Sequence, residues 1–380
     1  MAAIIYINQS PNDMLIDIIR SRSILGYDSQ LWCGKVEPTL MCELEKVAQV
    51  TYLKSYNRST IAKRFFSWLV FSIQVIGKWL LVSKRDIKFV LAVSNPPLYI
   101  YFILLLRGKV KVDYLIYDLY PDVIASRNWG SKMLKWLWHG VNKYTLCICN
   151  NIFVPSQSIA EKLNRFKNLQ AQVVFNWVQL DNIGPISFAH NTFRSEFAKP
   201  EEILLLYSGN FGATHNFDVL EDWIIFNKKA QQKFKFLFIG GGFHADRLMK
   251  LTHQQVPLAV LPWQPISNFP LSIASGNFAI ISYFPQTEES SIPSKVAYYL
   301  KTGTPLLYFG TRKSELGSMI EKYNLGFVIE DRHFEKLNLL LLQQTELAYT
   351  IQRENCVAIA AKLFSRNNVK LFNSNVPVIH

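Results

Sequence analysis

The sequence predicts an α/β protein made of two doubly wound domains in tandem. First, the chain has 380 residues, which is too long for one ordinary hydrophobic core. Second, short apolar segments alternate with longer helical stretches, as is typical of parallel sheets with crossover helices. Third, this alternation stops at a polar stretch, residues 180–200, and then starts again.

The first domain is assigned to residues 1–182, where apolar strands and helices follow one another. The expected strands are Ala3–Asn8, Ser29–Trp32, Phe89–Ser94, Lys111–Tyr117, Asn151–Pro155 and Ala171–Phe175. The expected helices are Pro11–Leu25, Arg64–Leu81, Tyr99–Leu106, Lys132–Cys147 and Ser158–Arg165.

The second domain is assigned to residues 200–350, after a connection from Leu180 to Pro200 that contains two Pro turn signals. Its expected strands are Ile203–Ser208, Phe234–Gly240, Leu258–Leu261, Phe278–Ser282, Pro305–Phe309 and Gly326–Ile329. The expected helices include Val219–Gln232 and Ser294–Thr302, and the tail from Leu337 to Leu371 is expected to be helical with one polar face.

The charge balance indicates an anionic partner. Lys and Arg exceed Asp and Glu by 41 − 28 = 13, which suits nucleic acid, a phosphorylated substrate or anionic lipid. The segment Lys54–Lys88 holds eight basic residues, one acid and the aromatic run Phe65–Phe71. Such a segment fits a helix on an anionic membrane surface, and equally a core helix with a solvated basic rim. Nucleic-acid binding is not expected, because no recognition motif is present.

The sequence predicts a cytoplasmic protein, either free or peripheral on the inner face of the cytoplasmic membrane. The most apolar stretch, Phe65–Val82, carries Gln74 and Lys78 and does not resemble a membrane span. Met1 is followed at once by a strand, without the pattern of a signal peptide. An odd, scattered set of cysteines suits reduced thiols, and no metal site is expected: Cys33, Cys42, Cys147, Cys149 and Cys356.

Ligands of doubly wound sheets bind at the carboxyl ends of the strands, so the loops there carry the chemistry. In Ser208-Gly209-Asn210-Phe211-Gly212, two glycines allow close backbone approach, and a helix start beyond them directs N–H groups at an anion. Gly240-Gly241-Gly242 follows the next strand in the same way. A tight strand-to-helix turn is the alternative interpretation for both loops.

A local conflict marks the helix that starts near Pro293. This residue is expected in the first turn, with Ser291 or Ser294 as the N-cap. Lys295 then lies near the positive end of the helix dipole, which is unfavourable unless an anion is bound. A pyrophosphate would resolve the conflict, and positions that break local rules are often functional.

Other polar residues also follow strands. Trp263 and Gln264 could contact a nucleobase by stacking and edge hydrogen bonds, or Trp263 could cap the domain surface. In the first domain, the carboxylates of Asp118 and Asp122 could bind sugar hydroxyls or cap a helix. Three further residues at strand ends are placed where an acceptor could bind: Asn8, Ser10 and Asn95.

Taken in order, these segments resemble the family 4 glycosyltransferases of the GT-B fold. The likeness is closest to the branch that builds bacterial capsule, colanic acid and O-antigen polysaccharides. The matching segments are Ser94-Asn95-Pro96-Pro97, Asp118-Leu119-Tyr120-Pro121-Asp122, Val154-Pro155-Ser156, Phe175-Asn176-Trp177-Val178, Tyr207-Ser208-Gly209-Asn210-Phe211-Gly212, Ile239-Gly240-Gly241-Gly242, Pro293-Ser294-Lys295 and Gly303-Thr304-Pro305.

The resemblance implies two Rossmann-like domains facing across a cleft, with a UDP-, GDP- or dTDP-linked sugar in the second and a lipid-linked or polysaccharide acceptor in the first. It also implies transfer with retention, no metal, no cofactor, and a final segment, residues 351–380, that crosses back to the first domain. Lys295 and Asp118 are the expected catalytic residues. The expected donor-binding residues are Ser208, Gly209, Asn210, Gly212, Gly241, Trp263, Gln264, Ser291, Pro293, Ser294 and Tyr298. The expected acceptor-binding residues are Asn8, Ser10, Asn95 and Asp122.

The chain departs from the family pattern at two places. The family carries a pair of glutamates around this helix, and the second falls at Tyr298 here, while Glu288 and Glu289 are off register for the first. A phenol cannot accept two ribose hydroxyl bonds as a carboxylate can, so ribose recognition must differ. The glycine-rich acceptor loop after the first strand is replaced by Asn8–Asp13. A non-catalytic scaffold and a nucleotide-sugar epimerase therefore stay open as alternatives.

Overall fold

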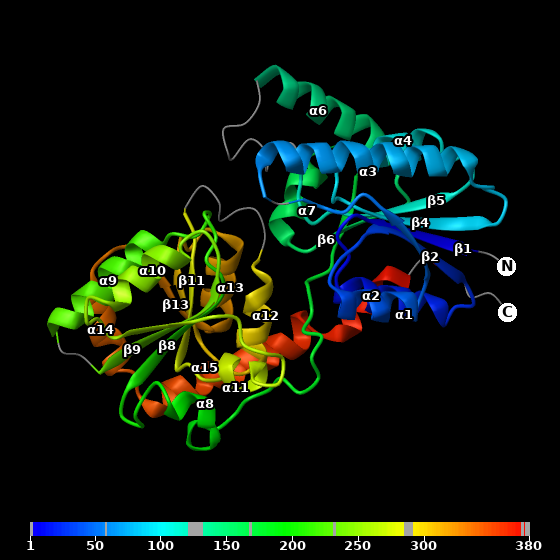
Figure 1. Ribbon diagram of the computed structural model, residues 1–380. Coiled ribbons are helices and arrows are strands. Elements are labelled where there is room, and N and C mark those ends of the chain that lie inside the picture. Colours follow the sequence, from blue (N-terminus) through cyan, green and yellow to red (C-terminus); the bar gives the residue numbers. More distant parts are fainter. Residues whose placement is uncertain are drawn as a thin grey trace. The chain divides into compact units, whose positions relative to one another are not determined.

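The protein forms two compact units in the computed structural model, which describes residues 3–57, 59–120, 132–166, 169–230, 233–284, 292–373 and 376. Unit 1 comprises Met1–Gln179 together with Arg366–His380, and unit 2 comprises Leu180–Ser365 (Figure 1). Each unit is a parallel sheet with helices on both faces, so the predicted α/β class with two doubly wound domains is confirmed.

The sheet of unit 1 has seven strands in the order β3-β2-β1-β4-β5-β6-β7. They are β1 (Ala3–Asn8), β2 (Asp28–Gly34), β3 (Gln49–Leu53), β4 (Ile87–Val93), β5 (Lys111–Leu115), β6 (Asn151–Val154) and β7 (Ala171–Val173). The helices are α1 (Asp13–Ser23), α2 (Pro38–Glu45), α3 (Ile61–Leu81), α4 (Tyr99–Leu105), α6 (Lys132–Thr145), η1 (Leu146–Ile148), α7 (Gln157–Asn164) and η4 (Arg366–Asn373).

Two apolar cores cover the two faces of this sheet. One core is formed with α3, α4 and α7, and the other with α1, α2 and η4. Because both faces are covered, the central strands read as continuous apolar runs, and all of β1 is buried. Figure 1 shows α3 and α4 on one side of the sheet and α1 and α2 on the other.

The sheet of unit 2 has six strands in the order β10-β9-β8-β11-β12-β13. They are β8 (Ile203–Asn210), β9 (Phe234–Gly241), β10 (Leu258–Leu261), β11 (Phe278–Ser282), β12 (Leu306–Phe309) and β13 (Gly326–Ile329). The helices are η2 (Phe188–His190), α8 (Thr192–Ser195), α9 (Phe217–Ala230), α10 (Ala245–Thr252), α11 (Phe269–Ile273), α12 (Ser294–Lys301), α13 (Glu315–Tyr323), α14 (Phe334–Leu342) and α15 (Glu346–Leu363).

Two elements of unit 1 were not expected from the sequence. Helix α2 is short and begins with Pro38 in its first turn. Strand β3 lies at the sheet edge and consists of exposed and half-buried residues, so it lacks the apolar run of a central strand. Helix α3 begins at Ile61 rather than Arg64, because the Thr60 side chain caps it by accepting a hydrogen bond from the Lys63 N–H.

The stretch from Leu180 to Pro200, expected as a connection, is part of unit 2. It carries α8, and the buried Arg194 guanidinium donates to the Ser275 and Glu202 carbonyl oxygens at 2.8 and 2.9 Å. The buried guanidinium thus helps to hold this polar segment on the unit.

The tail expected as helical from Leu337 to Leu371 is divided into α14, α15 and η4, because Thr345 caps a new helix at Glu346. Helix α15 packs on α12 in unit 2, whereas η4 packs on α1 in unit 1. Within the residues that the structure describes, no helix is both long and apolar enough to span a bilayer.

Candidate functional site

A cavity of about 390 Å³ opens at the carboxyl ends of β8 and β11 in unit 2. The strand order reverses between these two strands, and such switch points are where doubly wound sheets bind ligands. The cavity is lined by Ser208, Gly209, Asn210, His215, Trp263, Phe269, Ile273, Tyr283, Pro293, Ser294, Lys295 and Tyr298.

Glycines allow the backbones of β8 and β9 to approach each other closely at this edge. Gly209 of β8 pairs with Gly240 of β9, and their φ angles are +142° and +144°. A Cβ atom on Gly240 would lie 2.0 Å from the Gly209 carbonyl oxygen, so no larger residue fits there without a shift of the backbone. The strand ends therefore present bare backbone to the cavity.

Lys295 is the cation of this cavity. Its Nζ atom is buried, has no hydrogen-bond acceptor among the described residues, and lies 3.6 Å from the centroid of the Tyr207 ring. Burial lowers the pKa of Lys295 from 10.5 to about 7. An anion bound in the cavity would supply the missing partner and restore the charged form of the amine.

The start of α12 differs from the sequence prediction. Pro293 is the N-cap residue, not a first-turn residue, and Ser294 is the first helical residue, not the cap. The Pro293 side chain makes no capping hydrogen bond to the first-turn N–H groups. Lys295 thus lies in the first turn, as expected, at the positive end of a helix whose N-cap residue provides no side-chain acceptor.

Buried aromatic hydroxyls hold this arrangement in place. The Tyr299 hydroxyl accepts from Ser208 N at 2.7 Å and donates to Ser208 O at 3.0 Å, which ties α12 to the end of β8. The Tyr207 hydroxyl donates to Asn210 O at 2.9 Å and is also hydrogen-bonded to Nδ1 of His215. Burial lowers the pKa of His215 to about 3, so the imidazole is neutral at physiological pH.

The opposite wall of the cavity is apolar and aromatic. Trp263 is 60% exposed and its Nε1 lies beside Gly241, 3.5 Å from where a Cβ atom on that glycine would be. The rings of Phe269 and Tyr298 meet edge to face with their centroids 5.5 Å apart. These side chains offer π-faces on which a planar base could stack.

The structure brings most of the predicted donor-binding residues to this one cavity. The predicted residues that line it are Ser208, Gly209, Asn210, Trp263, Pro293, Ser294, Lys295 and Tyr298. Gly212 and Gly241 lie close by without lining it, and the amide of the half-buried Gln264 donates to the Pro262 carbonyl oxygen at 3.0 Å. Ser291 lies outside the described residues.

Four lining residues were missed by sequence reasoning: His215, Phe269, Ile273 and Tyr283. Tyr283 directly follows β11, so the rule that ligands meet strand ends could have found it. Phe269 and Ile273 lie on the short helix α11 and carry no signal of their own. His215 lies beyond the glycine loop, where only the folded backbone places it against Tyr207.

The predicted acceptor residues lie at the carboxyl edge of the unit 1 sheet. Asn8 is buried and its Oδ1 accepts from Ser10 N at 3.1 Å, while Asn95 O accepts from Gln9 N at 3.0 Å. Asp118 is exposed, and its N–H donates to the Ser94 hydroxyl at 3.2 Å. Asp122 lies outside the described residues. Three of the predicted acceptor residues and Asp118 therefore share one edge.

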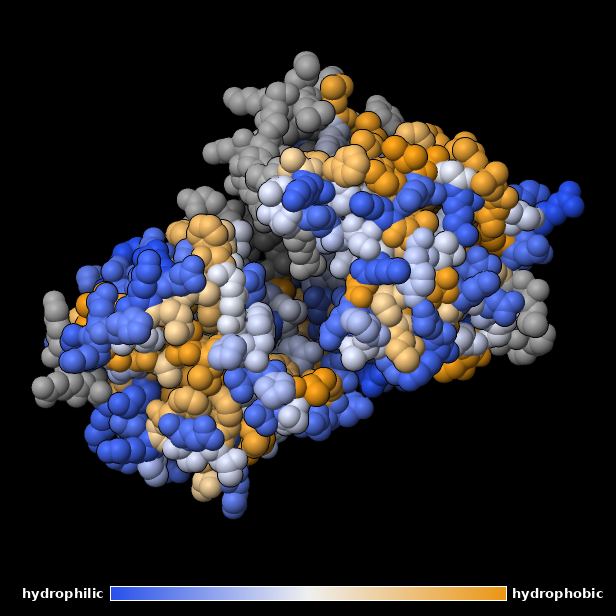
Figure 2. Space-filling view, viewed as in Figure 1, coloured by the Kyte–Doolittle hydropathy of each residue, from blue (hydrophilic) through white to orange (hydrophobic). Residues whose placement is uncertain are grey.

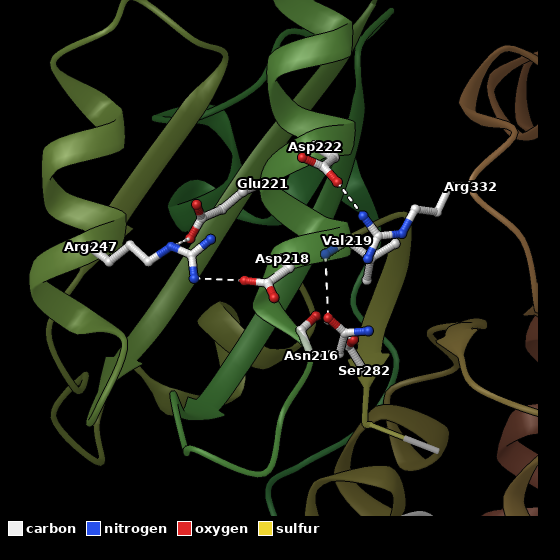
Figure 3. Close-up of polar contacts among 8 residues, drawn as sticks. All are labelled: Asn216, Asp218, Val219, Glu221, Asp222, Arg247, Ser282 and Arg332. Carbon is white, nitrogen blue, oxygen red and sulfur yellow. Dashed lines mark hydrogen bonds and ion pairs between the residues drawn. The ribbon is translucent and has the colours of Figure 1, made fainter. Parts of the chain in front are cut away.

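Two arginines near the carboxyl edge of the unit 2 sheet are paired with carboxylates. A smaller cavity of about 120 Å³ lies by the ends of β12 and β13, lined in part by Asn216 and Arg332. Figure 3 shows Arg332 directed at Asp222, and Arg247 directed at Asp218 and Glu221, with nitrogen–oxygen distances of 2.7 and 2.6 Å for the latter two. These arginines have carboxylate partners, whereas Lys295 has none among the described residues.

Among the described residues, no three His, Cys, Asp or Glu side chains are grouped so that they could hold a metal ion.

Neither a family model nor a curated protein matches this sequence. Solved structures do match it over nearly the whole chain. Anabaena HepE, in complex with UDP and glucose, has a TM-score of 0.68 at 13% identity, covering 98% of both chains. A glycosyltransferase from Rickettsia africae has 0.67 at 14%, covering 98% of this chain and 99% of that one. Sucrose-phosphate synthase from Thermosynechococcus elongatus has 0.71 at 13%, covering 98% and 97%.

This likeness shows the fold. With its two parallel sheets of seven and six strands, the chain has the GT-B fold of two Rossmann-like domains, as the sequence predicted.

Proposed function

We propose that this protein is a glycosyltransferase that binds a nucleotide-sugar donor in the cavity of unit 2 and transfers the sugar to an acceptor bound by unit 1. One observation carries the proposal. The Lys295 amine is buried without an anionic partner among the described residues, at the start of α12, where the N-cap residue Pro293 provides no side-chain acceptor, and beside the bare backbone of β8. A diphosphate matches this site in charge and in its need for N–H donors.

The chemistry follows from where charge develops. When the bond between the sugar C1 and the diphosphate oxygen breaks, negative charge grows on that oxygen. Lys295 and the N–H groups at the start of α12 stabilise this charge, which lowers the barrier. The acceptor hydroxyl attacks the same face of the sugar, and its proton passes to the departing oxygen, so the configuration at C1 is retained. The positive charge comes from the protein, and we propose that no metal is needed.

The other lining residues have roles in holding the donor. Trp263, Phe269 and Tyr298 provide the surface on which the base stacks. Ser208 and Asn210 lie at the end of β8, where they bind the sugar and phosphate oxygens. We assign the ribose to the neighbourhood of Tyr298, which stands where related enzymes have a glutamate. UDP-linked donors are tested first because HepE is also known in complex with UDP-glucose.

In unit 1 the acceptor meets Asn8, Ser10, Asn95, Asp118 and Asp122. We place the enzyme in family 4, with a lipid-linked or polysaccharide acceptor in the synthesis of cell-surface polysaccharide. Its proposed location is the cytoplasm, at the inner face of the membrane. A product assay with isolated lipid-linked acceptors identifies the acceptor class.

The test compares Lys295→Ala with Lys313→Ala, which removes an exposed lysine from the same unit. Turnover with a labelled nucleotide sugar should fall about 100- to 1,000-fold in Lys295→Ala, the loss expected for one group that stabilises a developing oxyanion. Lys313→Ala should keep the activity of the unchanged chain. Calorimetric titration with UDP, GDP and dTDP should show binding of at least one of them.

Three outcomes contradict the proposal. Full turnover in Lys295→Ala removes the assigned role of the lysine. The absence of binding to all three nucleotides favours a non-catalytic scaffold. Conversion of the donor without any acceptor indicates an epimerase.

A further inference from the structure

Helix α3 carries two apolar faces, and only one of them packs on the sheet. The packed face consists of residues that are at most 4% exposed: Trp68, Phe71, Val75 and Trp79. On the opposite face, Phe66 is 61% exposed, Leu69 50%, Ile73 59% and Leu80 61%. Their spacing of three, four and seven residues places these side chains in one stripe along the helix. A surface helix normally has polar residues there.

Two neighbouring helices extend this stripe. On α4, Phe102 is 50% and Leu105 69% exposed, and on α6, Leu137 is 49% and Val141 44% exposed. Helix α4 packs on both α3 and α6, and the Tyr101 hydroxyl of α4 donates to Asn142 Oδ1 of α6 at 2.7 Å. Figure 2 shows the hydrophobic colour gathered over α3 and α4. These exposed side chains of α3, α4 and α6 are called the three-helix face below.

The sequence of these helices is free of negative charge. Residues 61–81, 99–105 and 132–145 contain no Asp or Glu, although the whole chain has 28 of them. Exposed lysines stand at the ends of the face, with Lys63 in the first turn of α3, Lys109 after α4, and Lys143 in the last turn of α6. The partner that complements this face is therefore apolar in the middle and anionic around it.

The face also offers few hydrogen-bonding groups. Gln74 is exposed on α3, and its Oε1 already accepts from Lys54 N at 2.7 Å. A protein partner would meet this face with polar groups that need partners at the rim. The acyl region of a bilayer needs none, and its anionic headgroups pair with the lysines at the ends.

We infer that the three-helix face docks unit 1 on the surface of a bilayer that contains anionic phospholipids. The helices lie in the plane of the headgroups, with Phe66, Leu69 and Ile73 inserted below them. No helix among the described residues is suited to cross the membrane, so this docking is peripheral. In the sequence, a membrane surface at Lys54–Lys88 is one of two open interpretations, and the structure adds α4 and α6 to that surface.

Helix α3, which carries the exposed stripe, also contacts the edge proposed to bind the acceptor through its packed side. The Ser67 carbonyl oxygen of α3 accepts from Gln9 Nε2 at 2.9 Å, directly after β1. Trp68 meets the ring of Tyr120, which follows β5, with centroids 5.5 Å apart. A lipid-linked acceptor would thus remain in the membrane while its sugar reaches this edge. This last step depends on the proposed function, whereas the docking does not.

The experiment is co-sedimentation of the full chain with vesicles of phosphatidylcholine alone or mixed with phosphatidylglycerol. The unchanged chain should sediment with the mixed vesicles and stay in solution with the neutral ones. Replacing Phe66, Leu69 and Ile73 together by Ser should lower the partition coefficient at least tenfold, roughly the loss expected from three inserted apolar side chains. Circular dichroism checks that this variant is folded.

Two further variants test the docking without relying on the triple Ser variant. Lys63→Glu with Lys143→Glu keeps the apolar stripe and should lower binding to mixed vesicles by about tenfold or more, with a loss of salt sensitivity. The control Leu347→Ser with Ile351→Ser removes exposed apolar residues from α15 of unit 2 and should bind like the unchanged chain. UDP binding by unit 2 should stay the same in every variant.

The inference is overturned if the unchanged chain does not sediment with the mixed vesicles, or if it sediments equally well with the neutral vesicles. It is also overturned if both face variants sediment like the unchanged chain. Self-association that the triple Ser change abolishes, without vesicle binding, would mean that the face contacts a second copy instead. Loss of nucleotide binding in Lys295→Ala tests the other proposal and leaves this result unaffected.

Discussion

At the scale of single residues, Lys295 links the sequence to the proposed chemistry. Its position at the start of a helix is visible in the sequence, but its burial is not. The structure places its Nζ over the Tyr207 ring, and burial lowers the pKa of Lys295 to about 7. The nearby His215 is neutral, because burial lowers its pKa to about 3. The charge of Lys295 therefore changes near neutral pH, whereas that of His215 does not.

The pH dependence of donor binding should follow this lysine. Because the pKa of Lys295 is lowered from 10.5 to about 7, the free site loses its positive charge as the pH rises through 7. Above this pH, the amine must take up a proton again when the diphosphate binds. The affinity for UDP-glucose should fall steadily between about pH 7 and pH 9. Calorimetric titration at several pH values measures this slope.

The variant Lys295→Arg provides the comparison, because arginine stays charged throughout this range. Its binding profile should be nearly flat. If the unchanged protein also shows a flat profile, Lys295 does not contact the diphosphate.

The same shift predicts a pH effect on folding. The unfolded chain holds the lysine proton more tightly than the folded one between about pH 7 and pH 10.5, so stability without ligand rises with pH in this window. Below pH 7 the buried Lys295 amine is charged, and its burial lowers the free energy of unfolding by the full amount.

At the scale of secondary-structure elements, the joined ends of β8 and β9 shape the edge of the cavity proposed to bind the donor. The pair Gly209 and Gly240 lets the two backbones approach at an edge where other residues would need a left-handed conformation. The hydroxyl of Tyr299 then ties the end of β8 to α12, so the lysine and the glycine backbone are held together.

The change Gly240→Ala should lower the free energy of unfolding of unit 2 by about 2–4 kcal/mol, because of strained backbone and a clash with the Gly209 carbonyl oxygen. UDP binding should be lost with it. Chemical denaturation and calorimetry measure the two effects.

The matched change is Gly140→Ala, in α6, where a Cβ atom meets nothing within 4 Å. There the same substitution should stabilise the helix by up to about 1 kcal/mol. Equal effects at the two positions would mean that the approach of β8 and β9 is not a constraint.

At the scale of the whole molecule, the chain starts in unit 1, forms unit 2, and returns to unit 1 at Arg366. The returning segment η4 is anchored in the core of unit 1. Phe372 is 2% exposed and its ring lies 4.4 Å from that of Phe153, centroid to centroid. Its carbonyl oxygen accepts from Arg22, which is itself buried with Asp113.

The change Phe372→Ala should therefore destabilise unit 1 by about 3–5 kcal/mol, since it leaves a cavity in this core. Lys370→Ala, at an exposed position of the same segment, should change the stability by no more than about 0.5 kcal/mol. Denaturant unfolding followed by tryptophan fluorescence measures both, and UDP binding by unit 2 should persist. If Phe372→Ala unfolds like Lys370→Ala, the segment is not an integral part of unit 1.

The sequence was sufficient for the central strands and most helices because a strand buried on both faces must be apolar along its length. It failed for β3 and α2, which lie at the margin of the unit 1 sheet, where half-buried residues leave no such pattern. The glycine loop and Lys295 were found because a special backbone and a misplaced charge are local features. His215 was missed because only the folded backbone brings it to the cavity, whereas Tyr283 could have been found from its place directly after β11.

The sequence by itself determined the class of the fold and the position of a lysine in the first turn of a helix. These follow from local patterns of apolar residues, glycine and charge. Only the tertiary structure decided that Lys295 is buried against Tyr207, and that α3, α4 and α6 present one exposed apolar face. Burial and exposure depend on which elements pack together, and residues far apart in the chain establish that jointly.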